Sequence, residues 1–362
     1  MKGLKFRGLL FGVFALAVNN LFGAFPQLAE RVYYRGVFQV IRVLYDHTLG
    51  LIPIPMVYLL FILLVWIIAQ MLGRLWDAMT EHSLIKNRLF YSLLAVLNPL
   101  GWILFFFYFL WGWNYQKTSF EERMEFQPVQ ADTLVLISET QQVMEQLIAE
   151  RMGFMADTTQ VTHAQIPTDL ESMLRSEQEQ LLQSWAEPVY GRVRIRELRP
   201  SGILLRISTA GVYIPFVCEG HIDAGLHSLQ YPFTMAHEMA HGYGYTDEGV
   251  CNFIGYVTCM QSKNTMVRYG GLLGYWRYLL SNLRSEAPYS YHQVRRQMPS
   301  AIRMDLNDIA EQMDKFPDFM PQVRNAVYDS YLKSHGVKQG IANYNDIVRL
   351  VAQWKQKQAG GH

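Results

Sequence analysis

Three long apolar stretches in the first third of the chain constrain its fold more than any other feature. They run from about residue 8 to 25, 54 to 72 and 89 to 111. A helix of about twenty apolar residues matches the thickness of the hydrocarbon core of a bilayer. Lipid offers no hydrogen bonds to the backbone, so such a stretch must satisfy its own amides as a helix. The sequence therefore predicts three transmembrane helices in residues 1–116.

Basic residues predict how these helices are oriented. Lys2, Lys5 and Arg7 precede the first stretch, as they do in signal peptides and in uncleaved signal anchors. The sequence near Ala24 is a poor cleavage site, so we expect an anchor with a cytoplasmic N-terminus. Three spans from that side place the rest of the chain outside, and the small excess of basic residues on the inner side agrees. We therefore expect a multi-pass protein of the cell (inner) membrane with an extracytoplasmic C-terminal domain.

The overall composition excludes some classes of function. The formal net charge is +1, so the chain has no basic excess for binding nucleic acid. The chain has three cysteines, at positions 218, 251 and 259, and their odd number argues against a disulfide framework.

Residues 117–362 read as a second domain that is mainly helical with a small β-sheet, so the fold class is α+β. Helical periodicity is clear in residues 133–152 and 170–185. Val193–Glu197, Leu204–Ser208 and Gly211–Val217 read as three strands, which immediately precede a polar helical motif.

That motif is His-Glu-x-x-His, formed by His237, Glu238 and His241. Residues four apart share one face of a helix, so the two imidazoles can bind one metal ion together. Glu238 lies about 100° around the same helix, where it can reach a water at the metal without being a ligand. Two His ligands, one Glu as general base and one open position are typical of zinc hydrolases, so we expect Zn²⁺ as the cofactor.

Two residues compete to be the third protein ligand. Gly244 is a plausible end to the first helix, and a second helix then begins near Asp247. Glu248 would lie in the first turn of that helix, and Asn252, one turn later, would hold a ligand His by a hydrogen bond. Asp247 also fits, at the spacing of a metzincin-like site. The spacing leaves both carboxylates open, with Glu248 favoured.

Three motifs in this chain resemble a bacterial family of membrane-anchored zincin-like proteins known as a domain of unknown function (DUF3810). One motif follows the last apolar stretch, the second precedes the His-Glu-x-x-His helix, and the third is that helix with its continuation. The matching residues are Trp111, Gly112, Asn114 and Tyr115, then Gly211, Tyr213, Pro215, Phe216 and Glu219, then Gly244, Glu248, Asn252 and Phe253. The chain departs from the family pattern Glu-x-Glu-Ala-Asn, because it has Val250 in place of the second Glu.

The resemblance implies a zincin-like metallopeptidase domain behind transmembrane helices. By analogy it favours Glu248 as the third ligand and implies that Glu219 contacts the substrate or the surroundings of the metal. In zincins an edge strand before the zinc helix pairs with extended substrate, which here would be Gly211–Phe216.

The functional hypothesis is a membrane-anchored zinc metallopeptidase, a hydrolase in which Glu238 activates water. Its expected partners are a peptide or protein substrate and membrane lipid, with no nucleic acid. One alternative is a catalytically silent zincin-fold scaffold or binding protein. Another is a zinc hydrolase that acts on a non-peptide amide of the cell envelope. The sequence carries no indication of an oligomeric state.

Overall fold

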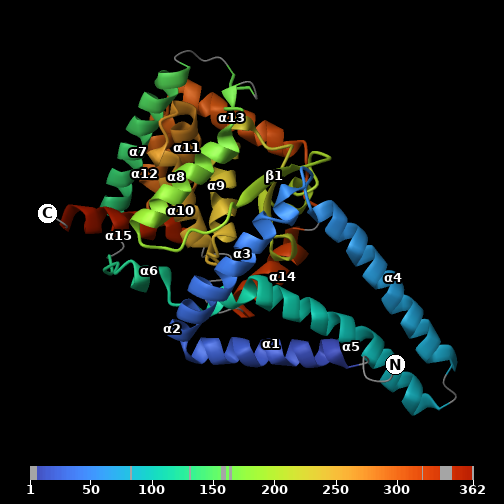
Figure 1. The fold of residues 1–362 in the computed structure, drawn as a ribbon. Helices are drawn as coiled ribbons and strands as arrows, with labels where there is room; N and C mark the ends of the chain where they lie inside the picture. The colour runs from blue at the N-terminus through green and yellow to red at the C-terminus, as the bar shows by residue number, and fades with distance from the viewer. Residues whose placement is uncertain are drawn as a thin grey trace. The chain divides into compact units, whose positions relative to one another are not determined.

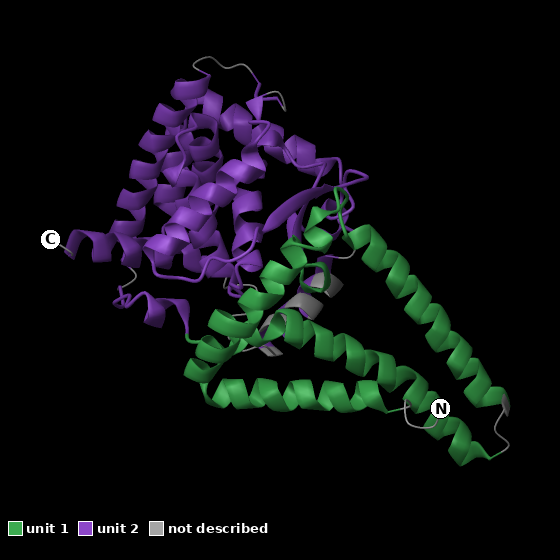
Figure 2. Ribbon diagram, viewed as in Figure 1, with its two compact units in different colours: residues 1–118, 214–219 green, residues 119–213, 220–362 purple. Residues whose placement is uncertain are grey.

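The computed structural model describes residues 6–81, 84–129, 132–155, 160–162, 165–319, 321–334 and 345–360. The chain forms two compact units, shown in Figure 2. Unit 1 comprises Met1–Thr118 and Ile214–Glu219, and unit 2 comprises Ser119–Tyr213 and Gly220–His362. The sequence predicted one boundary between residues 116 and 117. The structure divides the chain between residues 118 and 119, and it assigns the short segment Ile214–Glu219 to unit 1.

Unit 1 contains three helices that are long and apolar enough to cross a membrane, as a membrane protein has. They are α1 (Arg7–Ala24), α4 (Val57–Glu81) and α5 (Ile85–Leu110), drawn in blue to teal in Figure 1. All three coincide with the predicted apolar stretches. Helix α4 continues past the predicted end at residue 72, because the polar residues that follow are also compatible with a helix.

Helices α1 and α5 pack closely and run in the same direction. A methyl group added at Gly101 would lie 2.2 Å from the carbonyl oxygen of Gly8, so the two backbones nearly touch there. Asn98 Oδ1 accepts a hydrogen bond from the Gly8 amide at 2.8 Å. At the other end of α1, Gly23 lies against the side chain of Gln116, six residues beyond the end of α5. A shared direction is what a first and a third span require in a chain that crosses a membrane three times.

A helical segment and short turns connect the long helices of unit 1. Between α1 and α4 lie α2 (Pro26–Leu28), the π-helix η2 (Ala29–Val37), α3 (Phe38–Asp46) and the 3₁₀ turn η3 (Leu49–Leu51). The 3₁₀ segment η4 (Gly112–Gln116) follows α5. Tyr33 of η2 donates a hydrogen bond to the Phe109 carbonyl of α5 at 2.8 Å, which ties the connecting helix to the last span.

Unit 2 is mainly helical. Its helices are α6 (Phe120–Arg123), α7 (Thr133–Phe154), α8 (Leu170–Ser184), α9 (Tyr231–Gly242), α10 (Glu248–Gln261), α11 (Thr265–Glu286), α12 (Pro288–Gln297), α13 (Ser300–Asp314), α14 (Pro321–Ser334) and α15 (Ile347–Gly360). Helix α10 lies at the centre of the core, since every residue from Glu248 to Cys259 is buried. Helices α8, α9, α11 and α15 contact α10, so it is covered by helices around most of its circumference (Figure 1).

A three-stranded sheet accompanies the helices. Its strands are β1 (Arg194–Leu198), β2 (Gly211–Ile214) and β3 (Glu219–Asp223), in the order β1-β3-β2, so β2 is an edge strand. Strands β2 and β3 form a hairpin, because only four residues link them and the Asp223 amide donates to the Ala210 carbonyl at 3.0 Å. The sheet precedes α9 in the chain, as predicted, and β1 contacts that helix.

One predicted strand is wrong, and one strand was missed. Leu204–Ser208 contains the 3₁₀ turn η6 (Leu205–Ile207), because the Asp223 carboxylate accepts hydrogen bonds from the amides of Gly202, Leu204 and Leu205. These bonds curl the chain around one side chain. Strand β3 was missed because its sequence alternates polar residues with Gly and Ile, which reads as a solvated loop, although all five of its residues are buried.

Candidate metal centre

Helix α9 carries the two histidines and Glu238. The helix starts with Pro232 in its first turn, where the missing amide hydrogen of proline costs nothing. It ends at Gly242, and Gly244 follows with φ of 91°, a left-handed conformation that suits glycine. His237, Glu238 and His241 are all buried.

Helix α10 begins at Glu248, so the two competing carboxylates have different positions relative to the helix. Asp247 is the N-cap residue, and its side chain accepts a hydrogen bond from the Val250 amide at 2.9 Å. Glu248 is the first residue of the helix and turns its carboxylate toward α9. The structure therefore brings Glu248 next to the two histidines and uses Asp247 as a helix cap.

Three donor atoms meet in a nearly equilateral triangle. His237 Nε2 lies 3.2 Å from His241 Nε2, Glu248 Oε2 lies 3.2 Å from His237 Nε2, and Glu248 Oε2 lies 3.4 Å from His241 Nε2. Among the residues that the structure describes, these three side chains are the group whose donor atoms lie close enough to hold a metal ion together. The imidazoles hold the pKa of Glu248 well below its usual value, although burial acts in the opposite direction.

Hydrogen bonds at the Nδ1 atoms fix the orientation of both imidazole rings. His237 Nδ1 lies 2.9 Å from Asn252 Oδ1, and His241 Nδ1 lies 2.9 Å from the carbonyl oxygen of Tyr245. Both acceptors require a proton on Nδ1, which leaves each Nε2 with a lone pair directed into the triangle. The structure thus gives Asn252 the geometry that the sequence predicted for it.

Tyr278 is a residue near the site that sequence reasoning missed. It lies on α11, and its hydroxyl hydrogen-bonds to Asn252. The sequence gives little sign of this contact, because α11 reads as a packing helix rich in Tyr, Leu and Trp. Tyr278 therefore helps to position Asn252, and Asn252 in turn orients the ring of His237.

Replacing Asn252 with alanine is expected to weaken metal binding without removing a ligand. Loss of a hydrogen-bond partner of a ligand His typically lowers metal affinity about 10–100-fold. Competition with a chelator measures this affinity, and Asn282→Ala is a matched control because the Asn282 side chain donates to a backbone carbonyl within α11 and is not a member of the donor triangle. Equal affinities in both variants would show that Asn252 does not orient His237.

Glu238 is enclosed by the hairpin of the sheet. A methyl group added at Gly211 of β2 would lie 2.6 Å from Glu238 Oε1, and one added at Gly220 of β3 would lie 3.1 Å from Glu238 Cβ. Among the described residues, no group hydrogen-bonds to Glu238 Oε2, although the atom is buried. Burial raises the pKa of Glu238 to about 7, and the nearby imidazoles lower it by less.

Glu219 is not part of the donor triangle. It is the first residue of β3 and belongs to unit 1, where its Oε2 accepts a hydrogen bond from the Met56 amide at 2.9 Å. Its carboxylate is therefore occupied by the backbone of unit 1 and is not a member of the three-residue cluster.

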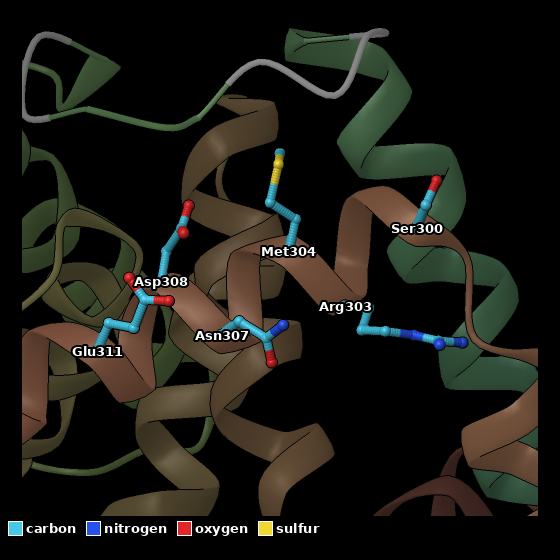
Figure 3. A pocket seen from close by; sticks show the side chains of 6 residues that line it. All are labelled: Ser300, Arg303, Met304, Asn307, Asp308 and Glu311. Carbon is cyan, nitrogen blue, oxygen red and sulfur yellow. The ribbon is translucent and has the colours of Figure 1, made fainter.

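Another hollow in unit 2 offers no comparable constellation. It has a volume of about 440 Å³ and lies on α13, shown in Figure 3. Its lining residues are Ser300, Arg303, Met304, Asn307, Asp308 and Glu311. Ser300 and Arg303 lie at the opposite end from Asp308 and Glu311, so the polar groups do not converge on one point (Figure 3). None of these residues is a member of the His237–His241–Glu248 cluster.

Comparisons with known proteins identify a family. Residues 33–352 match the family described as "Protein of unknown function (DUF3810)". No curated protein and no solved structure matches the chain. The family match extends over both compact units and covers most of the 362 residues. The chain therefore belongs to the DUF3810 family.

Proposed function

We propose that this chain is a membrane-anchored, zinc-dependent metallopeptidase with a zincin-like catalytic domain. The observation that carries the proposal is the triangle of donor atoms on His237, His241 and Glu248. Its sides are 3.2, 3.2 and 3.4 Å. A tetrahedral zinc ion with bonds of about 2.0–2.1 Å separates its ligand atoms by about 3.3 Å. The triangle therefore has the size of one face of a zinc coordination tetrahedron.

The chemistry of the donors agrees with their spacing. Two neutral imidazoles and one carboxylate form a common hydrolytic zinc site, which leaves a position for water or substrate. Zinc bound there supplies Lewis-acid polarisation of a carbonyl group and a lowered pKa for water. The residues around the triangle hold it rigidly, because both Nδ1 atoms have hydrogen-bond acceptors and the ligands are buried.

Glu238 is the residue proposed to move the proton. It follows His237 directly on α9, and its Oε2 is buried without a hydrogen-bond partner among the described residues. In the proposed reaction the carboxylate accepts a proton from the attacking water and passes it to the leaving amine. A metal site that is only structural needs no such base, so Glu238 favours hydrolysis over the scaffold alternative.

The position of β2 supports a peptide as the substrate. Strand β2 lies at the edge of the sheet, and its Gly211 lies against the carboxylate of Glu238. Edge strands bind extended peptides by adding a strand to the sheet. A non-peptide amide of the cell envelope would not use this feature, so we favour peptides or proteins as substrates.

The proposal places the catalytic domain outside the cell membrane. The three apolar helices and the common direction of α1 and α5 support an odd number of crossings from a cytoplasmic N-terminus. A multi-pass protein of the inner membrane, with membrane lipid around unit 1, follows from this topology.

Metal removal tests the proposal on the full chain purified in detergent. We expect elemental analysis to find one zinc ion per chain, and a mixture of peptides to be cleaved by the zinc-loaded protein. A chelator should abolish cleavage, because the base has no activated water without the metal, and added zinc should restore it. Absence of bound metal even after reconstitution with zinc would contradict the metallopeptidase.

A further inference from the structure

The segment Ile214–Glu219, which we call the hairpin tip, contains the last residue of β2, the first residue of β3 and the four residues between them. Its flanking strands lie against Glu238 in unit 2, yet the tip itself belongs to unit 1. The chain thus leaves unit 2 at the end of β2 and re-enters it at the start of β3.

Three hydrogen bonds within unit 1 hold the tip. Arg42 Nη1 donates to the Cys218 carbonyl at 2.8 Å, and Tyr45 donates its hydroxyl proton to the Phe216 carbonyl at 3.0 Å. Both donors come from α3. The third bond runs from the Met56 amide to the Glu219 carboxylate. These bonds fix the tip at three points along its length, and two of them are made by side chains of a single helix.

Apolar contacts surround the same tip. Cys218 forms a buried cluster with Ile41 of α3 and Leu110 of α5, and Phe216 packs against that cluster. Phe216 also lines a cavity of about 880 Å³ in unit 1, whose other walls come mainly from α4 and α5. The tip is therefore embedded in unit 1 by packing as well as by hydrogen bonds.

The backbone of the tip is strained, which shows that its surroundings determine its shape. Cys218 has φ of 48°, a left-handed conformation that residues with a side chain rarely adopt. Such conformations persist only where neighbouring contacts impose them. The Arg42 hydrogen bond to the Cys218 carbonyl is one of those contacts.

The strands on either side of the tip leave Glu238 little freedom. Gly220 directly follows Glu219, and Gly211 lies three residues before Ile214. A methyl group added at either glycine would come into close contact with Glu238. A displacement of the tip that is transmitted along this short hairpin must therefore move the backbone that encloses the Glu238 carboxylate.

We propose that unit 1 positions the β2–β3 hairpin through the contacts that unit 1 makes with the hairpin tip. Arg42, Tyr45 and Glu219 are then positioning residues for Glu238, and the membrane unit contributes to activity beyond anchoring the chain. This inference rests on the proposed function in one respect, which is that Glu238 is the catalytic base. The physical coupling between the tip and the strands can be measured without any substrate.

Tyr45→Phe in the full-length protein is the test, because it removes one hydroxyl and keeps the ring that packs against the tip. Tyr33→Phe is the matched control, since the Tyr33 hydroxyl also donates to a backbone carbonyl in unit 1, that of Phe109. Hydrogen exchange is measured at the amides of β2 and β3, with metal content and steady-state kinetics on the same samples. A Tyr45→Phe and Glu219→Ala double variant enlarges the effect.

In the Tyr45→Phe variant we expect the amides of β2 and β3 to exchange about fivefold faster, the factor that corresponds to the loss of one hydrogen bond. The metal content should stay at the wild-type level, and kcat should fall by a similar factor while KM changes less than about twofold. Tyr33→Phe should match the wild type in every measurement.

Two results would overturn the coupling. One is faster exchange confined to residues 214–219, with residues 211–213 of β2 and 220–223 of β3 unchanged in both the single and the double variant. The other is an equal effect of Tyr33→Phe, which would indicate general loosening of unit 1. A wild-type protein that binds zinc but cleaves no peptide contradicts the proposed function, while the exchange data still decide whether the tip controls the strands.

Discussion

Replacement of Glu248 by alanine is expected to abolish stoichiometric zinc binding, while replacement of Asp247 leaves it intact. Glu248 Oε2 completes the triangle with the two imidazoles, whereas the Asp247 carboxylate caps α10 through the Val250 amide. Removal of a ligand should weaken binding by more than the about 10–100-fold expected when only its hydrogen-bond partner is lost. Elemental analysis of the purified variants, beside the wild type, measures the difference.

The Asp247→Ala variant is more than a negative control, because it has an effect of its own. Loss of an N-cap side chain typically destabilises a helix by about 0.5–2 kcal/mol, so this variant should unfold at a lower temperature while retaining its zinc. The opposite pattern, in which zinc is lost from Asp247→Ala and kept in Glu248→Ala, would make Asp247 the third ligand. That result would retain a metal site but reject the donor triangle.

Replacement of Glu238 by glutamine is expected to lower turnover of a peptide substrate by about 10²–10⁴-fold, the usual contribution of general acid–base catalysis. Glutamine has nearly the same shape and fits the space between β2 and β3, but its amide cannot accept the proton from water. His237, His241 and Glu248 are unchanged in this variant, so zinc content should equal that of the wild type. Steady-state kinetics and elemental analysis on one preparation measure both quantities.

The control for this variant is Glu179→Gln, the same chemical change on α8. Glu179 accepts a hydrogen bond from the Tyr243 hydroxyl and is not a member of the donor triangle. It should leave turnover close to the wild-type value. A Glu238→Gln protein that binds zinc and keeps full function would instead favour the non-enzymatic scaffold, because the proposed base would then be dispensable.

The sequence by itself determined the features that depend on local spacing. The three apolar stretches appear as α1, α4 and α5, because the length and apolar character of a segment suffice to predict a helix that can span a bilayer. The separation of His237 and His241 predicted that both rings share one face of a helix, since helical geometry fixes the positions of residues four apart. Asn252 was predicted one turn after Glu248 by the same rule.

The spacing of residues in the sequence could not decide whether Glu248 or Asp247 is the third ligand. The two residues are neighbours, and either carboxylate is long enough to serve as a ligand. The start of α10 separates them, because the Asp247 side chain is occupied by the Val250 amide and Glu248 faces α9. Only the packing of α10 against α9 places the two histidines and this carboxylate together.

The tertiary structure also decided what the polar residues before α9 do. Glu219, His221 and Asp223 lie in the buried strand β3, because β3 is the central strand of the sheet and pairs with both β1 and β2. Asp223 turns the predicted strand Leu204–Ser208 into a 3₁₀ turn by accepting amides far away in the sequence. The assignment of Glu219 and the hairpin tip to unit 1 is likewise set by contacts with residues more than 150 positions earlier, which no local pattern encodes.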